Sequence, residues 1–173
     1  GGSGAVRSMI YNYLDNGEAA LIPDWFWAPY KTIAEENQRR AETYTMFDEE
    51  LKFSTKDIKE KAKKYLAAQN QILVIFNTPG HNPTGYSLSE EDWADLIPFF
   101  KELALANPGK RVVIGLDMAY VDYCGDPVKA RHFLSMFTDL PENMQVVIAF
   151  SMSKSFFVYG MRSGAIVGFH QSA

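Results

Sequence analysis

Lys154 is the residue in this sequence that most directly indicates chemistry. It lies in the segment Ser151-Met-Ser-Lys-Ser-Phe-Phe-Val-Tyr-Gly-Met-Arg162, directly after the apolar run 145–150. Such a run predicts a buried strand, so the lysine is expected at the C-terminal end of that strand. Partial burial and the neighbouring positive charge of Arg162 both favour the uncharged, nucleophilic amine, which can form a Schiff base. An ordinary surface loop with two charges is the alternative that this segment leaves open.

Asp117 and Tyr120 follow a second run of this kind. Residues 111–120 predict a buried strand that places both side chains at its far end. A carboxylate inside an apolar strand end is unfavourable unless a cation or a hydrogen-bond donor meets it. We therefore expect a positive group beside Asp117.

A loop crowded with turn-forming residues follows the apolar run 72–76. Residues 77–85, Asn-Thr-Pro-Gly-His-Asn-Pro-Thr-Gly, hold two prolines and two glycines, which predict a rigid, irregular backbone. A plain surface connection is one interpretation. In open α/β sheets, however, ligands bind to the loops that follow buried strands, which makes Asn82 a candidate.

Glycines and aromatic residues near the start of the chain give two further candidates. Gly2, Ser3 and Gly4 precede a predicted helix at 5–14, and free N–H groups at a helix start bind anions such as phosphate; an expression linker is the other interpretation. The aromatic cluster Trp25, Phe26, Trp27 and Tyr30 is expected either in the core or as a flat wall that binds a ring.

Strands and helices alternate along the chain. The predicted strands are 19–24, 42–47, 72–76, 111–120, 145–150 and 164–169. The other predicted helices are 31–40, 54–68 with Ser54 and Asp57 as a variant capping box, one that begins at Ser89 and ends at Asn107-Pro-Gly109, and 128–137. This alternation predicts a three-layer α-β-α fold with a mostly parallel sheet and right-handed crossovers. The strand C-termini then meet at one edge, where Asn82, Asp117, Tyr120, Ser151, Lys154 and Arg162 converge.

Composition limits the classes of function. The 173 residues, 47% of them hydrophobic, predict one globular, soluble domain. A net charge of −4 without a basic stripe argues against nucleic acid, and no apolar run reaches membrane-spanning length. The three histidines and Cys124 show no metal-ligand spacing, so no metal is expected. One cysteine and no secretory leader predict the cytoplasm.

An amine, a buried carboxylate, a helix start and an arginine match the groups that pyridoxal 5′-phosphate needs. The sequence resembles the class I/II pyridoxal-phosphate aminotransferases of fold type I, the family of aspartate aminotransferase, along essentially its whole length. The motifs that carry this resemblance are His-Asn-Pro-Thr-Gly at 81–85, Asp-x-x-Tyr at 117–120, and Ser-x-Ser-Lys with an arginine eight residues after the lysine. Thr78-Pro-Gly80 departs from the residues more usual in the family.

The resemblance assigns roles. Lys154 would be the Schiff-base lysine and proton shuttle, and Asp117 would keep the ring nitrogen protonated. Asn82 and Tyr120 would bond the phenolic oxygen. Ser151, Arg162 and the turn at Gly2, Ser3 and Gly4 would hold the phosphate. Trp27 would stack on the ring, with Trp25 as the alternative.

The resemblance also implies that residues 1–173 are the central part of a cofactor-binding large domain, truncated at both ends, with the small domain absent. The expected function is amino-group transfer from an amino acid to a 2-oxo acid, with aspartate or aromatic amino acids as donors. A carbon–sulfur lyase of the same fold, or a cofactor-binding fragment without turnover, is the alternative. We expect the full-length protein to be a homodimer and this fragment alone to be inactive.

Overall fold

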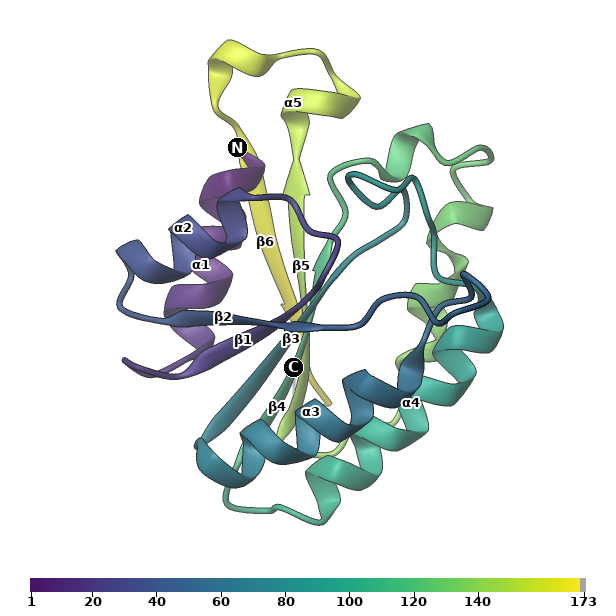
Figure 1. The fold of residues 1–173 in the computed structure, drawn as a ribbon. Coiled ribbons are helices and arrows are strands. Elements are labelled where there is room, and N and C mark those ends of the chain that lie inside the picture. The colour runs from purple at the N-terminus through teal and green to yellow at the C-terminus, as the bar shows by residue number, and fades with distance from the viewer. Residues whose placement is uncertain (172–173) are drawn as a thin grey trace.

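The computed structural model describes residues 1–171; Ser172 and Ala173, the end of the predicted domain, lie outside the described residues. Within this part, six strands form one sheet in the order β2-β1-β3-β4-β5-β6 (Figure 1). Their bounds are β1 Ala19–Pro23, β2 Arg40–Tyr44, β3 Gln71–Asn77, β4 Arg111–Asp117, β5 Met144–Ser151 and β6 Gly164–Phe169. Strands β1 to β5 are parallel, and β6 runs antiparallel to β5. The predicted mostly parallel α/β fold is confirmed.

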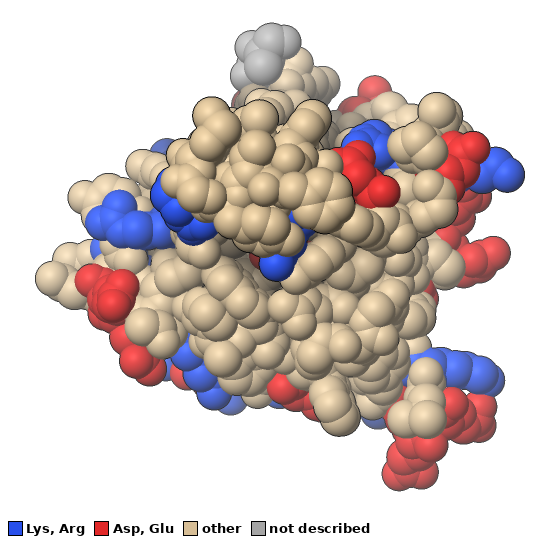
Figure 2. All heavy atoms as spheres, turned by 90° about the horizontal axis from the view of Figure 1, so that it is seen from above, with Lys and Arg blue, Asp and Glu red and all other residues tan. Residues whose placement is uncertain are grey.

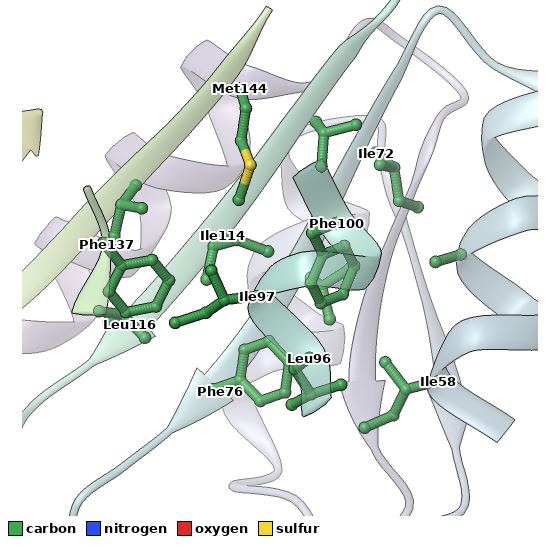
Figure 3. Packing of buried hydrophobic residues seen from close by; sticks show 14 of the residues in the cluster. Ile58, Ile72, Phe76, Leu96, Ile97, Phe100, Ile114, Leu116, Phe137 and Met144 are labelled. Carbon is green, nitrogen blue, oxygen red and sulfur yellow. The ribbon is translucent and has the colours of Figure 1, made fainter. Parts of the chain in front are cut away.

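Helices cover both faces of the sheet. Helices α1 (Gly2–Tyr13) and α2 (Pro29–Glu36) pack on one face, and α3 (Thr55–Ala68) and α4 (Glu90–Leu105) pack on the other (Figure 1). Because apolar side chains from both faces of a strand must be covered, β3 and β4 are buried almost throughout, as their unbroken apolar runs predict. Figure 3 shows Leu96, Ile97 and Phe100 of α4 among side chains of the sheet.

Gly115 lets α1 lie directly against β4. A β-carbon at this position would lie 2.5 Å from the sulfur of Met9 and 3.1 Å from a methyl group of Leu73. Both neighbours are fully buried, so they have little room to move. The missing side chain of Gly115 therefore sets how closely α1 packs on the sheet, and α1 begins at the candidate site.

The helix starts were predicted with mixed success. At α4 the predicted cap is confirmed, because Ser89 Oγ accepts from the Asp92 N–H at 3.1 Å while the Asp92 carboxylate accepts from the Ser89 N–H at 2.8 Å. At α3 the predicted capping box is wrong, since Ser54 makes no side-chain cap bond. The Asp57 carboxylate instead accepts from the Thr45 N–H at 2.6 Å, which ties α3 to the end of β2.

Other predicted elements differ from the structure in their bounds or type. The strand predicted at 42–47 is β2, which begins two residues earlier and ends at Tyr44. Helix α2 ends at Glu36 rather than at residue 40, because Gln38 adopts a left-handed conformation (φ 60°) and turns the chain into β2. The predicted helix 128–137 is a 3₁₀ helix over Lys129–Met136. Phe133 of this helix stacks on Trp93 of α4, with 5.4 Å between the ring centroids.

Among the described residues, no helix is both long enough and apolar enough to cross a membrane.

Candidate functional site

A cavity of about 250 Å³ opens where strands β3, β4 and β5 end. Every predicted site residue except Gly4 contributes to its wall. The lining residues are Gly2, Ser3, Trp27, Asn77, Asn82, Asp117, Ala119, Tyr120, Ser151, Ser153, Lys154, Tyr159 and Arg162. The structure thus brings together side chains that are up to 160 positions apart in the chain, from Gly2 to Arg162.

Lys154 lies on the short helix α5 (Met152–Ser155), which begins directly after β5. Ser151 starts this helix, and its hydroxyl oxygen accepts from the Ser153 N–H at 3.3 Å. The half-buried Lys154 side chain places Nζ 5.5 Å from the ring centroid of Tyr120 and 5.3 Å from that of Tyr159. Two aromatic rings therefore hold the amine at the cavity.

The predicted glycine turn is instead the first turn of α1, which begins at Gly2. The Gly1 carbonyl already accepts from the Ala5 N–H at 3.1 Å, so the helix includes the glycines rather than following them. The Gly2 N–H donates to Ser151 Oγ at 3.3 Å. A β-carbon at Gly2 would lie 2.9 Å from that of Ser151, so only glycine permits this contact. Gly4 is exposed and lies outside the cavity wall.

Arg162 and two serine hydroxyls complete this end of the cavity. The Arg162 guanidinium donates to the Tyr159 carbonyl at 3.0 Å and lies near the start of α1, where a β-carbon on Gly1 would be 3.3 Å from Nη2. Ser153 is 7% exposed, and its Oγ has no hydrogen-bond partner among the described residues. N–H groups of a first helical turn lack acceptors within the helix. This end of the cavity is therefore rich in hydrogen-bond donors.

Asp117 lies in the wall of the same cavity and is buried. Its Oδ2 accepts from the Tyr30 hydroxyl at 2.6 Å, and its Oδ1 accepts from the Ala119 N–H at 3.2 Å. Burial raises the pKa of Asp117, and these two donors act in the opposite direction. The Tyr30 hydroxyl and the Ala119 N–H are thus the protein donors that meet this buried carboxylate, and the positive group expected beside it stays a prediction.

The loop 77–85 is fixed by its own side chains. Asn77 Nδ2 donates to the Asp117 carbonyl at 2.9 Å, and Asn77 Oδ1 accepts from the Asn82 N–H at 2.7 Å. His81 is buried with Nδ1 2.9 Å from the Thr84 hydroxyl, and burial lowers the pKa of its imidazole. The peptide bonds before Pro79 and Pro83 are cis. This network holds Asn82 at the cavity, as the loop's position after a buried strand predicts.

The aromatic cluster divides between core and cavity. Trp27 lines the cavity, whereas Trp25 is 57% exposed and does not. Tyr30 is fully buried, and its ring meets Trp27 edge to face at 5.4 Å. Of the two tryptophans, Trp27 is thus the one placed to face a bound ring.

Four residues with polar side chains at or behind the cavity were not predicted as site residues: Tyr30, Asn77, Ser153 and Tyr159. Ser153 lies inside the Ser-x-Ser-Lys motif, so its position beside the lysine was a usable signal. Asn77 opens a loop that was already singled out. Nothing in the local sequence indicates that Tyr30 reaches Asp117, because the two residues are 87 positions apart.

Figure 2 looks down on the side of the molecule where the strands end and α5 lies. Most charged side chains lie toward the periphery of this view, and a few basic ones lie near the middle of a largely uncharged surface. Such a surface fits a small ligand held by a few donors better than a long polyanion.

The fold and the cavity define a three-layer α/β protein with a lysine at the carboxyl ends of its strands. Residues 1–173 match the profile of the family "aminotransferase class I and II", so the chain belongs to this family, as the motifs predict.

Two curated relatives illustrate the match. The cytoplasmic aspartate aminotransferase of Dictyostelium discoideum is 27% identical over 95% of this chain and 36% of its own length. The aromatic-amino-acid aminotransferase of Paracoccus denitrificans is 27% identical over 96% of this chain and 40% of its own length.

Solved structures agree. A crystal structure of an aminotransferase from Anaerococcus prevotii is 43% identical, with a TM-score of 0.95 over 98% of this chain and 41% of its own. An aromatic-amino-acid aminotransferase from Burkholderia pseudomallei, covalently bound to pyridoxal phosphate, shares the fold at 22% identity, with a TM-score of 0.68 over 98% of this chain and 40% of its own. The chain thus spans between 36% and 41% of the length of these four proteins.

Proposed function

We propose that the full-length protein is a pyridoxal-phosphate-dependent aminotransferase and that residues 1–173 are part of its cofactor-binding large domain. One observation carries the proposal: Lys154, the buried Asp117 and a donor-rich helix start line one cavity. Family membership supports it.

The residues present fit this cofactor. Its phosphate needs hydrogen-bond donors, and the Ser151 hydroxyl, the first turn of α1, Arg162 and the unpartnered Ser153 hydroxyl can supply them. A protonated ring nitrogen needs a carboxylate, which Asp117 supplies. We assign the phenolic oxygen of the cofactor to Asn82 and Tyr120, and one ring face to Trp27. When bound, pyridoxal phosphate supplies an aldehyde for the amine and a ring that accepts the electron pair released at the substrate's Cα.

The chain's own residues then have distinct tasks. Lys154 would hold the cofactor through its Nζ and, as a free amine once the substrate's amino group has replaced it, would accept the proton from the substrate's Cα. Its position between Tyr120 and Tyr159 restricts where that amine can move. Asp117 holds a proton at the ring nitrogen by its negative charge. Ser151 and Arg162 anchor the phosphate, so that the other groups meet the substrate in a fixed orientation.

An amino acid and a 2-oxo acid are the substrates that this proposal requires. Relatives that are named aspartate and aromatic-amino-acid aminotransferases support these two donor classes. We further propose a cytoplasmic homodimer. The relatives include both cytoplasmic and mitochondrial forms, so fractionation of cells that produce the full-length protein tests the location.

Chemical labelling of the full-length protein tests the function. After loading with pyridoxal phosphate and reduction with borohydride, peptide mapping should place the pyridoxyl group on Lys154. Lys154→Arg should abolish labelling and 2-oxo acid formation from an aspartate or aromatic donor. The control Lys64→Arg, on the exposed side of α3, should change neither. An adduct mainly on another lysine would contradict the proposal, and cofactor binding without 2-oxo acid formation would exclude transamination.

A further inference from the structure

Tyr30 is a buried hydroxyl that the proposed chemistry does not yet use. It lies in the first turn of α2, its side chain is 0% exposed, and its hydroxyl donates to Asp117 Oδ2 at 2.6 Å. Tyr30 does not line the cavity, whereas Asp117 does. Any influence of Tyr30 on a bound molecule must therefore pass through a residue that does line the cavity, and its hydroxyl group contacts only Asp117 among them.

The remaining bonds of Asp117 leave it able to accept from the cavity. Its Oδ1 accepts from the Ala119 N–H at 3.2 Å, so each carboxylate oxygen has one donor in the protein. An ionised carboxylate offers about four acceptor positions, so a donor in the cavity can still be accommodated. The two protein donors fix the plane of the carboxylate while they leave this capacity free.

The phenol is suited to act as a permanent donor. Burial, the charge of Asp117 and their hydrogen bond raise the pKa of Tyr30 well above its ordinary value. The hydroxyl therefore keeps its proton throughout the range in which an enzyme works. The edge-to-face contact with Trp27 at 5.4 Å, with an interplanar angle of 88°, fixes the ring that carries it.

We propose that Tyr30 is a positioning residue that keeps Asp117 ionised and oriented toward the cavity, and thereby strengthens the hold of the protein on a proton at the cofactor's ring nitrogen. This inference rests on the proposed function, because it requires pyridoxal phosphate in the cavity. The other titratable or charged side chains that line the cavity with Asp117 are Tyr120, Lys154, Tyr159 and Arg162. They are unchanged in the variants described below, so differences between those variants report on Tyr30.

The test uses the full-length protein loaded with pyridoxal 5′-phosphate that carries ¹⁵N in its ring. The ¹⁵N chemical shift reports directly whether this nitrogen is protonated, and it is followed as the pH is raised. In Tyr30→Phe, the pH at which the nitrogen loses its proton should fall by about one unit or more, since a hydrogen bond to a charged group is lost. In steady-state kinetics, kcat should fall while KM changes little.

Tyr44→Phe is the matched control. Tyr44 is also buried (1% exposed), and its hydroxyl donates to the Ile75 carbonyl at 3.4 Å rather than to Asp117. This variant should titrate as the unmodified protein does. A second variant, with 3-fluorotyrosine at position 30, keeps the hydroxyl and therefore should fold normally. Its phenol is more acidic and a stronger hydrogen-bond donor, so the pH at which the ring nitrogen loses its proton should rise.

The outcomes separate this inference from the proposed function. If Tyr30→Phe and the fluorinated variant both titrate as the unmodified protein does, or if Tyr44→Phe shifts equally, the role of Tyr30 is refuted while the aminotransferase assignment stands. If the unmodified protein does not attach pyridoxal phosphate to Lys154, the proposed function fails, and this inference fails with it.

Discussion

Asp117 lies at the end of strand β4, buried in the wall of the cavity. Burial makes its negative charge unfavourable and also strengthens the interaction of that charge with a group bound in the cavity. It is buried, and two hydrogen-bond donors stabilise its charged form against the effect of burial. We expect Asp117→Ala in the full-length protein to lower turnover by about two orders of magnitude or more, since the ring nitrogen loses the group that keeps it protonated. Cofactor affinity should fall far less, because the phosphate contacts that we propose for Ser151, Arg162 and the start of α1 do not involve Asp117.

Asp117→Asn is the companion variant, since the amide keeps the shape and one acceptor but not the charge. It should lose turnover to a similar extent, as measured by steady-state kinetics, with cofactor affinity from fluorescence titration. Near-normal turnover in either variant would remove Asp117 from the mechanism.

At the residue scale, the sequence predicted those site residues whose side chains are reactive or polar and which also lie at the end of an apolar run. Lys154, Asp117 and Asn82 each follow an apolar run that ends at the same edge of the sheet, so their convergence could be predicted. Tyr30 could not be predicted in its role. Its contact with Asp117 depends on how α2 packs against α1 and β2, and that packing is set by many side chains rather than by a local pattern.

At the scale of elements, the apolar runs predicted the strands and the amphipathic segments predicted the helices, but the ends of elements were less predictable. Hydrophobic periodicity does not separate an α-helix from the 3₁₀ helix that Lys129–Met136 forms. The start of α3 shows why caps are uncertain. Asp57 has the right spacing from Ser54 for a capping box. Its carboxylate, however, accepts a hydrogen bond from the backbone N–H of Thr45, which lies outside α3.

Asp57 also provides a pH-dependent test of this link between α3 and the end of β2. Burial raises the pKa of Asp57, but the hydrogen bond from the Thr45 N–H and the charge of Lys61 together lower this pKa below its ordinary value. A depressed folded-state pKa means that the stabilisation is complete above the unfolded-state pKa, about 3.9, and is lost as the pH falls through the folded-state pKa. Asp57→Asn should therefore lower stability at pH 7 by up to about 1 kcal/mol, and not at the lowest pH.

Thermal unfolding of the full-length protein between pH 7 and pH 2 measures this effect. The midpoint for Asp57→Asn should approach that of the unmodified protein as the pH falls. Glu60→Gln, an exposed change on the same helix, is the control and should leave the midpoint unchanged at each pH. A difference that is independent of pH would contradict the assigned role of the Asp57 charge.

At the scale of the molecule, the sequence predicted the layers but not the direction of β6. A parallel and an antiparallel strand can share an apolar pattern, and direction is set by the connection. The connection of residues 152–163 from β5 to β6 holds only two short helices, α5 and the 3₁₀ helix Tyr159–Met161, so β6 returns antiparallel. This arrangement brings Arg162, which lies just before β6, to the same edge as Lys154.

The structure indicates which surface the expected homodimer would use. Of the aromatic cluster at 25–30, Tyr30 is fully buried and Phe26 and Trp27 are partly buried, so the cluster leaves no large apolar surface uncovered. Exposed apolar side chains gather instead between Lys154 and β6. They are Phe156, Phe157, Tyr159 and Met161, at 58%, 72%, 50% and 71% exposure. Large exposed apolar patches mark contacts on most soluble proteins, and symmetric homodimers are the commonest assemblies.

We therefore expect the full-length protein to form a homodimer through a surface that includes residues 156–161. Met161→Glu should weaken dimerisation, because a charge would have to be buried against apolar side chains of the second copy. Leu105→Glu, at an equally exposed apolar position (69%) at the end of α4, should leave the dimer intact. Light scattering across a wide range of protein concentration measures both. A full-length protein that stays monomeric while it binds cofactor and transaminates would overturn the expectation, and so would equal effects of the two variants.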